Sequence, residues 1–166
     1  PLREQQKIAG VLSIVQRGIE LQNELAERTT ELKKSMMHKL FTEGVRGERQ
    51  KETEIGMIPE SWRVVEFSEM VIYTSKPRNL LVEFPVSFIP MELISEQKIY
   101  ITNTEIRDKV SSWTFVFDGD VLLAKITPSF ENGKQGIVKI EGEYAYATTE
   151  VIAFKEKEGE SDKLFI

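Results

Sequence analysis

The sequence predicts an α+β protein in which one long helix precedes a β-rich domain. Two observations predict this division. Residues 1–43 carry a helical apolar pattern, and no proline follows Pro1 until Pro59. From residue 63 onward the chain consists of short runs rich in Val, Ile, Phe and Tyr, separated by Asp-Gly, Asn-Gly and Glu-Gly turn pairs. We therefore expect a helix over residues 1–43, a linker over 44–62 and a β-rich domain over 63–166.

The predicted helix carries an apolar stripe at heptad spacing, interrupted by Gln22 and Thr29. At 1.5 Å per residue the helix would be roughly 60 Å long, too long to lie wholly on a domain built from the remaining residues. The stripe is therefore predicted to form a coiled coil with another segment or chain, and packing on its own domain is the alternative. The interface positions are Ile8, Val11, Val15, Leu25, Leu32 and Met36.

Residues 44–62, GVRGERQKETEIGMIPESW, have the composition of a linker, with three glycines, one proline and many charges. The last part of this linker contains the apolar residues Ile55, Met57, Ile58 and Trp62. We therefore expect it to dock on the domain that follows.

Eight segments of the β-rich domain are typical of strands: RVVEF, MVIYT, FPVSFIP, KIYIT, WTFVF, DVLLAKI, GIVKI and AYATTEVIAF. MELISEQ and NTEIRDKV are expected to add short helices or turns. The final residues, DKLFI, look like the start of an apolar element. The β-rich domain is therefore predicted to be incomplete at its C-terminus or completed by another chain.

Composition excludes several kinds of site. The chain has no Cys, which excludes disulfides, zinc ribbons and a cysteine nucleophile and fits a reducing cytoplasm. Its single histidine, His38, lies in the helical pattern, so we expect neither a catalytic triad nor a metal site. No apolar run approaches the roughly 20 residues of a membrane helix, and no secretory signal is visible. A soluble cytoplasmic protein is expected.

The charge is unevenly distributed around a net value of −5. Residues 1–50 hold nine Lys/Arg against seven Asp/Glu, whereas residues 51–166 hold thirteen against twenty. Neutralisation of phosphates supplies most of the affinity of proteins for nucleic acid. The acidic residues 51–166 are therefore poorly suited to bind DNA unaided.

The catalytic motifs in the sequence are either incomplete at their reactive residues or common by chance. Residues 127–130, TPSF, differ from the Asn/Asp-Pro-Pro-aromatic tetrapeptide of amino methyltransferases at the first and third positions. Residues 132–135, NGKQ, lack the first glycine and the hydroxyl of a phosphate-binding loop. Glu83 with residues 96–98, EQK, matches a nuclease pattern that is common by chance. Asp118 and Asp120 flank Gly119 and are explained by a turn. We expect no catalytic residues.

Two polar loops remain as candidate contact surfaces. DVLLAKI predicts a buried strand, with Val121, Leu122, Leu123 and Ile126 in the core. Thr, Ser and Asn side chains can hydrogen-bond phosphates or base edges, and Lys and Arg add charge. From this pattern alone, solvated loops and a nucleic-acid surface are equally open. The candidates are Lys125, Thr127, Ser129, Asn132 and Lys134 in the first loop, and Lys76, Arg78 and Asn79 in the second.

The order of these features resembles a known family. PLREQQKIAGVL, LKKSMMHKLFTEG and ETEIGMIPESWRVVEF resemble the central conserved region of the DNA-specificity subunit of type I restriction–modification enzymes. GDVLLAKITPSFENGKQG and YATTEVIAF resemble the body of a target recognition domain in that family. The joint order of these pieces is more specific than any one of them.

The resemblance implies a non-catalytic protein that reads DNA. A specificity subunit holds two target recognition domains apart by long helices, and each domain reads half of a bipartite site. Residues 1–43 would be one spacer helix, paired with another. The β-rich domain would be a single recognition domain, and the chain would be a fragment, a truncated gene product or a half-subunit that restores two-fold geometry by homodimerising. Modification and restriction subunits would join it, and S-adenosylmethionine, ATP and Mg²⁺ would be bound by those partners. The rival interpretation is a coiled-coil module that binds protein and has no DNA specificity.

Overall fold

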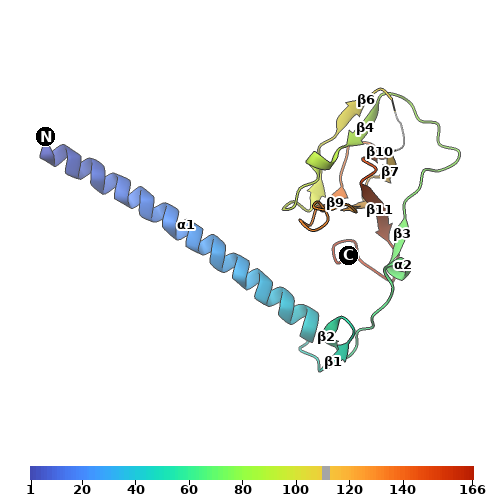
Figure 1. The fold of residues 1–166 in the computed structure, drawn as a ribbon, viewed down its shortest axis with the longest axis horizontal. Coiled ribbons are helices and arrows are strands. Elements are labelled where there is room, and N and C mark those ends of the chain that lie inside the picture. Colours follow the sequence, from blue (N-terminus) through green and yellow to red (C-terminus); the bar gives the residue numbers. More distant parts are fainter. Residues whose placement is uncertain (110–112) are drawn as a thin grey trace. The chain divides into compact units, whose positions relative to one another are not determined.

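The computed structural model describes residues 1–109 and 113–166, so residues 110–112 of the predicted β-rich domain lie outside the described ranges. The chain forms two compact units, Pro1–Val64 and Val65–Ile166. Figure 1 labels most of their elements. Unit 1 contains α1 (Leu2–Glu43), β1 (Gln50–Thr53) and β2 (Gly56–Pro59). Unit 2 contains α2 (Phe67–Met70), β3 (Val71–Tyr73), β4 (Val86–Ile89), the 3₁₀ helix η1 (Met91–Leu93), β5 (Tyr100–Ile101), β6 (Glu105–Arg107), β7 (Thr114–Phe117), β8 (Val121–Ala124), β9 (Gln135–Val138), β10 (Tyr144–Ala147) and β11 (Val151–Glu156).

The predicted long helix followed by a β-rich region is confirmed. Helix α1 spans 42 residues, and none of the residues of this fully described helix is buried. The apolar stripe is accordingly open, with exposed fractions between 54% and 66% at Ile8, Val11, Val15, Leu25, Leu32 and Met36. No helix within the described ranges is long and apolar enough to cross a membrane.

Helix α1 ends at a glycine that also meets the β1–β2 hairpin. Gly44 has a φ of 67°, and its N–H donates to the carbonyl of Leu40 at 3.0 Å. A Cβ on Gly44 would lie 3.3 Å from Cγ of Pro59, the last residue of β2. The rings of Phe41 and Trp62 meet edge to face, with centroids 6.3 Å apart. The hairpin is therefore packed on the end of the helix.

Linker composition did not indicate this hairpin. Strands β1 and β2 pair antiparallel, with Thr53 opposite Gly56. The Thr53 hydroxyl donates to the Gly56 carbonyl at 2.7 Å and closes the turn. Docking of residues 44–62 on the following unit stays a prediction.

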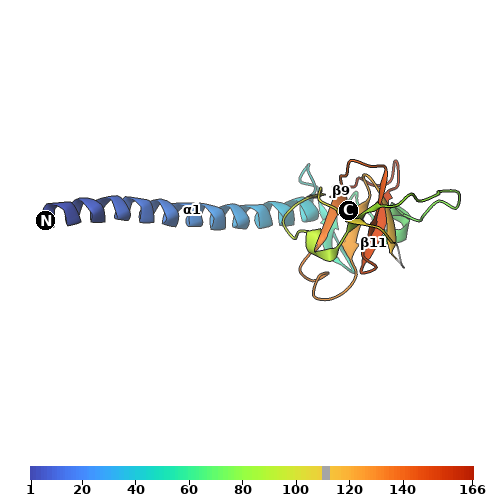
Figure 2. The ribbon, with the colours of Figure 1, turned by 90° about the horizontal axis from the view of Figure 1, so that it is seen from above.

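Unit 2 consists of two sheets that face each other (Figures 1 and 2). One sheet has the strand order β6-β4-β10-β7 and the other β3-β11-β8-β9-β5. Consecutive strands β10 and β11 lie in different sheets, so the chain crosses between them at residues 148–150. The single proton of the Thr114 hydroxyl is shared between the carbonyls of Thr148, at 3.0 Å, and Val151, at 3.4 Å, which ties β7 to this crossing.

Alternation along the strands produces three apolar layers. The layer between the sheets contains Ile89, Ile94, Ile101, Val116, Leu122, Val138, Ala145, Ala147, Val151 and Ala153. The outer face of the five-stranded sheet carries Val71, Val121, Ile137 and Phe154. The outer face of the four-stranded sheet carries Val86, Phe88, Phe115 and Tyr146.

Three local predictions were wrong. RVVEF was predicted as a strand, but helix α2 begins at Phe67, because Glu66 and Glu69 form a capping box at its start. NTEIRDKV was predicted as a helix or turn, but β6 forms there because it pairs with β4. Val110, at the end of that segment, lies outside the described residues. AYATTEVIAF was predicted as one strand but divides into β10 and β11.

Replacing Gly44 with Ala is expected to destabilise unit 1 by about 1–3 kcal/mol, because its backbone, with φ 67° and ψ −178°, is in a region that only glycine readily adopts and because a Cβ would crowd Pro59. Thermal unfolding followed by helical circular dichroism measures the effect. Gly10→Ala is the control, since Gly10 lies in open space within α1 and Ala is the better helix former. Equal stability of Gly44→Ala and the wild-type protein would contradict this account of the helix end.

Candidate nucleic-acid interface

The first predicted polar loop connects β8 to β9 and is closed at its base. Its two ends are held by the bond from the Ala124 N–H to the Lys134 carbonyl, at 3.0 Å. The Lys125 N–H donates to the Glu150 carbonyl at 2.9 Å, which fixes the loop to the crossing before β11. Both strands belong to the middle of the five-stranded sheet. The sheet therefore sets where the loop leaves the unit.

Backbone hydrogen bonds order the loop internally. The N–H groups of Phe130 and Asn132 donate to the carbonyls of Ile126 and Pro128, at 2.8 and 2.9 Å. The Lys134 N–H donates to the Ser129 carbonyl at 3.0 Å. Of the predicted contact residues in this loop, Lys125, Thr127 and Asn132 are exposed and Ser129 is half-buried. The loop thus presents several polar side chains from a structured frame.

Lys134 differs from the other predicted residues. Its side chain is half-buried, and its Nζ donates to the carbonyl of Met91 at 3.1 Å. This bond ties the loop to η1, so a bracing role already accounts for Lys134. Its assignment as a DNA contact stays a prediction.

The core assignment at this strand is partly correct. Val121 and Leu122 are buried and Leu123 is half-buried. Ile126, predicted to be in the core, is 37% exposed. That prediction was wrong because β8 ends at Ala124 and the chain turns away from the sheet before Ile126.

The second predicted set lies on a separate surface. Lys76, Arg78 and Asn79 are exposed residues of the β3–β4 segment, residues 74–85. Strands β3 and β8 both pair antiparallel with β11 and so run in the same direction, but β3 ends at Tyr73, opposite the Phe154 that also faces the first residue of β8. The β3–β4 segment then runs away from the side of unit 2 where the β8–β9 loop lies (Figures 1 and 2).

The two carboxylates of the β7–β8 turn support the backbone, as predicted. Asp120 Oδ2 accepts a hydrogen bond from the Phe117 N–H at 2.8 Å, and Asp118 Oδ1 accepts one from the Ile140 N–H at 2.9 Å. Between them Gly119 has a φ of 89°, and its N–H donates to the Val138 carbonyl at 2.8 Å. These bonds explain why Asp-Gly-Asp stands directly before a buried strand.

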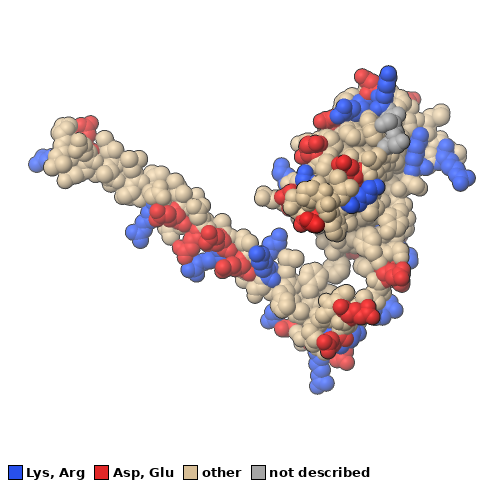
Figure 3. Space-filling model, viewed as in Figure 1, with Lys and Arg blue, Asp and Glu red and all other residues tan. Residues whose placement is uncertain are grey.

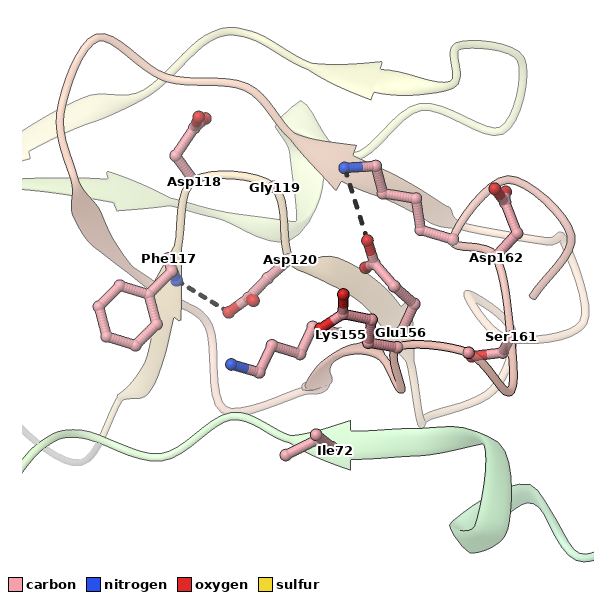
Figure 4. Close-up of a pocket in the computed structure, with 12 residues that line it drawn as sticks. Ile72, Phe117, Asp118, Gly119, Asp120, Lys155, Glu156, Ser161 and Asp162 are labelled. Atoms are coloured by element: carbon pink, nitrogen blue, oxygen red, sulfur yellow. Dashed lines mark hydrogen bonds and ion pairs between the residues drawn. The ribbon is translucent and has the colours of Figure 1, made fainter.

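Asp120 also lines an open cavity of about 700 Å³ (Figure 4). The cavity lies between the β7–β8 turn, the end of β11 and the residues that follow it, where Lys163 and Glu156 form an ion pair at 3.9 Å. Within residues 1–109 and 113–166, no group of three or more His, Cys, Asp or Glu side chains could hold a metal ion. We assign the cavity no ligand.

Burial raises the pKa of Asp120 above its ordinary value of 3.8. The Phe117 N–H opposes this shift most strongly, followed by the Thr74 hydroxyl and the charge of Lys155, while Glu156 adds to it. The sequence did not reveal that Asp120 is buried, with only 2% of its surface exposed. Its place immediately before an apolar strand was the available signal.

The sequence of this chain is similar to parts of known proteins. No family model matches the chain. It is 36% identical over 98 residues to the EcoEI type I restriction enzyme specificity subunit of Escherichia coli, covering 57% of this chain and 16% of that protein. It is 46% identical over 72 residues to the MjaVIII type I restriction enzyme specificity subunit of Methanocaldococcus jannaschii, covering 43% of this chain and 17% of that protein.

A solved structure has the same fold. It was described for the complex assembly and conformational transition of a type I R-M system, and its matching chain shares 18% identity and a TM-score of 0.54. The match covers 95% of this chain and 38% of that chain. The resemblance predicted from the sequence is therefore confirmed: this chain is similar to a portion of the type I restriction enzyme specificity subunits. It spans about a sixth of the length of these curated relatives.

Replacing Asp120 with Asn should raise the stability of unit 2 at pH 7. The raised pKa means that the folded state holds the Asp120 proton more tightly than the unfolded chain does. The stability from this group is therefore present below pH 3.8 and is lost as the pH rises through the folded pKa. Asn keeps an acceptor for the Phe117 N–H without the buried charge. Denaturant unfolding at pH 4 and pH 7 measures the difference.

The Asp120→Ala variant is the control for the hydrogen bond. It leaves the Phe117 N–H without its acceptor and should cost about 1–3 kcal/mol at pH 4, and less at pH 7, where it also removes the buried charge. A wild-type protein more stable than Asp120→Asn at pH 7 would show that the carboxylate charge is favourable, against this prediction.

Proposed function

We propose that this chain is a DNA-recognition portion of a type I restriction–modification specificity subunit. The observation that carries the proposal is the identity of 36% and 46% to two such subunits from different organisms. Unit 2 would read one half of a bipartite target. The chain would supply no chemistry of its own, because its methyltransferase and phosphate-loop likenesses fail at their reactive residues and its nuclease pattern is common by chance.

Helix α1 would act as a spacer that pairs with another helix. Its apolar stripe is exposed along the whole helix, and burying such side chains stabilises an association by about 1.5–3 kcal/mol each. The partner would be a second spacer helix, from the rest of the protein or from a second copy of the chain. Modification and restriction subunits would assemble on this core and would carry S-adenosylmethionine, ATP and Mg²⁺.

Unit 2 would contact DNA through its polar loops. The acidic balance of residues 51–166 makes strong binding by the chain alone unfavourable in electrostatic terms. Assembly would offset this repulsion, because modification subunits that close around the duplex would contribute cationic surface. The residues proposed to face DNA are Lys125, Thr127, Ser129, Asn132, Lys134, Lys76, Arg78 and Asn79.

A coiled-coil module that binds only protein is the second candidate. The open stripe of α1 and the acidic balance of residues 51–166 favour it. The two candidates differ in one respect, which is whether unit 2 distinguishes DNA sequences.

Selection from random duplexes distinguishes them. The protein, alone and assembled with its modification subunit, is incubated with a random duplex pool at several salt concentrations, and bound DNA is sequenced. We expect the assembled complex to enrich one half-site, because base contacts add to backbone contacts only at a matching sequence. No enrichment by the assembled complex would refute DNA reading and leave the coiled-coil module. Metal-dependent cleavage or methyl transfer by the chain alone would refute the non-catalytic role.

Placing a charge in the stripe should weaken helix pairing. Leu25→Asp should raise the dissociation constant of the paired form at least about 30-fold, since it removes a buried Leu and adds a charge that pairing must desolvate. Sedimentation equilibrium measures the association, with helical content checked by circular dichroism. Asn23→Asp adds the same charge on the opposite side of α1 and should have little effect. A wild-type chain that stays monomeric at all concentrations would contradict pairing between two copies.

A further inference from the structure

Two stretches of the acidic residues 51–166 carry two positive charges without an acidic residue, and residues 132–140, with Lys134 and Lys139, are one of them. Residues 70–82, MVIYTSKPRNLLV, contain Lys76 and Arg78 and no Asp or Glu. The first polar loop, by contrast, includes the exposed Glu131 among its lysines. Figure 3 shows Lys and Arg at the outer end of the β3–β4 segment, where it extends furthest from the sheets in Figure 1.

Lys76 and Arg78 are also uncommitted. Both are exposed, and neither forms an ion pair with any residue of the described ranges. Several other cations of unit 2 are engaged, although Lys98, Lys109 and Lys125 are exposed and form no ion pair within the described ranges either. Lys134 donates to the Met91 carbonyl, and Arg107 pairs with Glu105 while its guanidinium lies 5.2 Å from the centre of the Phe88 ring.

The segment that carries these two cations is anchored at several points. At its start the Thr74 N–H donates to the Ala153 carbonyl of β11 at 2.9 Å. In its middle the Leu80 N–H donates to the Pro77 carbonyl at 3.2 Å, which closes a turn next to Arg78. Leu80 and Val82 then pack against the aromatic outer face of the four-stranded sheet. The backbone around Lys76 and Arg78 is therefore positioned before any ligand binds.

We infer that residues 75–79 form the phosphate-binding surface of unit 2, with Lys76 and Arg78 contacting the backbone of duplex DNA. An arginine offers a planar pair of donors that matches two phosphate oxygens, and a lysine adds a point charge. Such contacts fix the register of a protein on the duplex, whereas base contacts specify sequence. The β8–β9 loop, whose Lys134 is engaged, is left for base contacts. This inference rests on the proposed function and assigns phosphate contacts to residues 75–79 and base contacts to the β8–β9 loop.

The salt dependence of DNA binding tests the inference. Each lost phosphate contact lowers the slope of log K against log salt by about 0.9. Lys76→Ala/Arg78→Ala should therefore lower the slope by about 1.8, so that between 50 and 200 mM salt the wild-type affinity falls about 10-fold more than that of the variant. The measurement uses the protein assembled with its modification subunit, on random-sequence duplex and on the enriched half-site. The decrease in slope should be the same on the random-sequence duplex and on the enriched half-site.

The matched control removes the same charge from another region of unit 2. Lys98 precedes β5 and Lys139 follows β9, and β5 and β3 are opposite edges of the five-stranded sheet. Lys98→Ala/Lys139→Ala should leave the slope within about 0.5 of the wild-type value. A general effect of net charge would instead lower the slope equally for this control and for Lys76→Ala/Arg78→Ala. Thermal unfolding verifies that all variants fold. Arg78→Lys as a single substitution should keep the wild-type slope.

The outcomes separate this inference from the proposed function. Half-site enrichment with an unchanged slope for Lys76→Ala/Arg78→Ala would overturn the inference and keep DNA reading. A reduced slope without enrichment of any sequence would support the phosphate surface and overturn sequence reading. A wild-type complex that binds no duplex would overturn both.

Discussion

The apolar layer between the two sheets is the constraint on which unit 2 depends. Its small members, among them Ala145, Ala147 and Ala153, are buried and let the sheets approach closely. Successive side chains of a strand point to opposite faces, so this layer uses one face of each sheet. The opposite faces also carry apolar side chains. Both outer faces then need cover of their own. Met70 of α2 and Ile166 pack on one, and Leu80 and Val82 of the β3–β4 segment pack on the other. Folding therefore places the segment that bears Lys76 and Arg78.

The architecture was predictable where periodicity was long or turn chemistry was strong. The helical pattern of residues 1–43 yielded α1 within one residue, and Asp-Gly and Asn-Gly pairs separated β7, β8 and β9 correctly. Prediction failed where pairing with a distant segment decided the outcome. Strand β6 exists because β4 lies beside it, and the split of β10 from β11 follows from their membership of different sheets. A pattern read from a few consecutive residues contains no information about which distant strand will pair with them.

The candidate site was predictable as a set of side chains but not as a surface. Residue types marked both polar loops, yet only the structure shows that the β8–β9 loop and the β3–β4 segment point to different places. Lys134 looked equivalent to Lys125 in the sequence, and its bond to Met91 across 43 positions separates them. The exposure of Ile126 and the burial of Asp120 likewise depend on where β8 begins and ends. Propensity places such boundaries only to within a few residues.

The closed base of the β8–β9 loop separates the sequence and length of the loop from the stability of the sheets. The Ala124–Lys134 hydrogen bond holds the two stems together independently of the side chains between them. Since doubling the length of a flexible loop costs only about 0.6 kcal/mol in closure entropy, residues inserted or exchanged beyond this bond would leave the sheets nearly untouched. Ser129, Asn132 and their neighbours could then diverge freely among related proteins while one scaffold persists. Diversity at the tip and conservation at the stem can thus coexist in a single short connection.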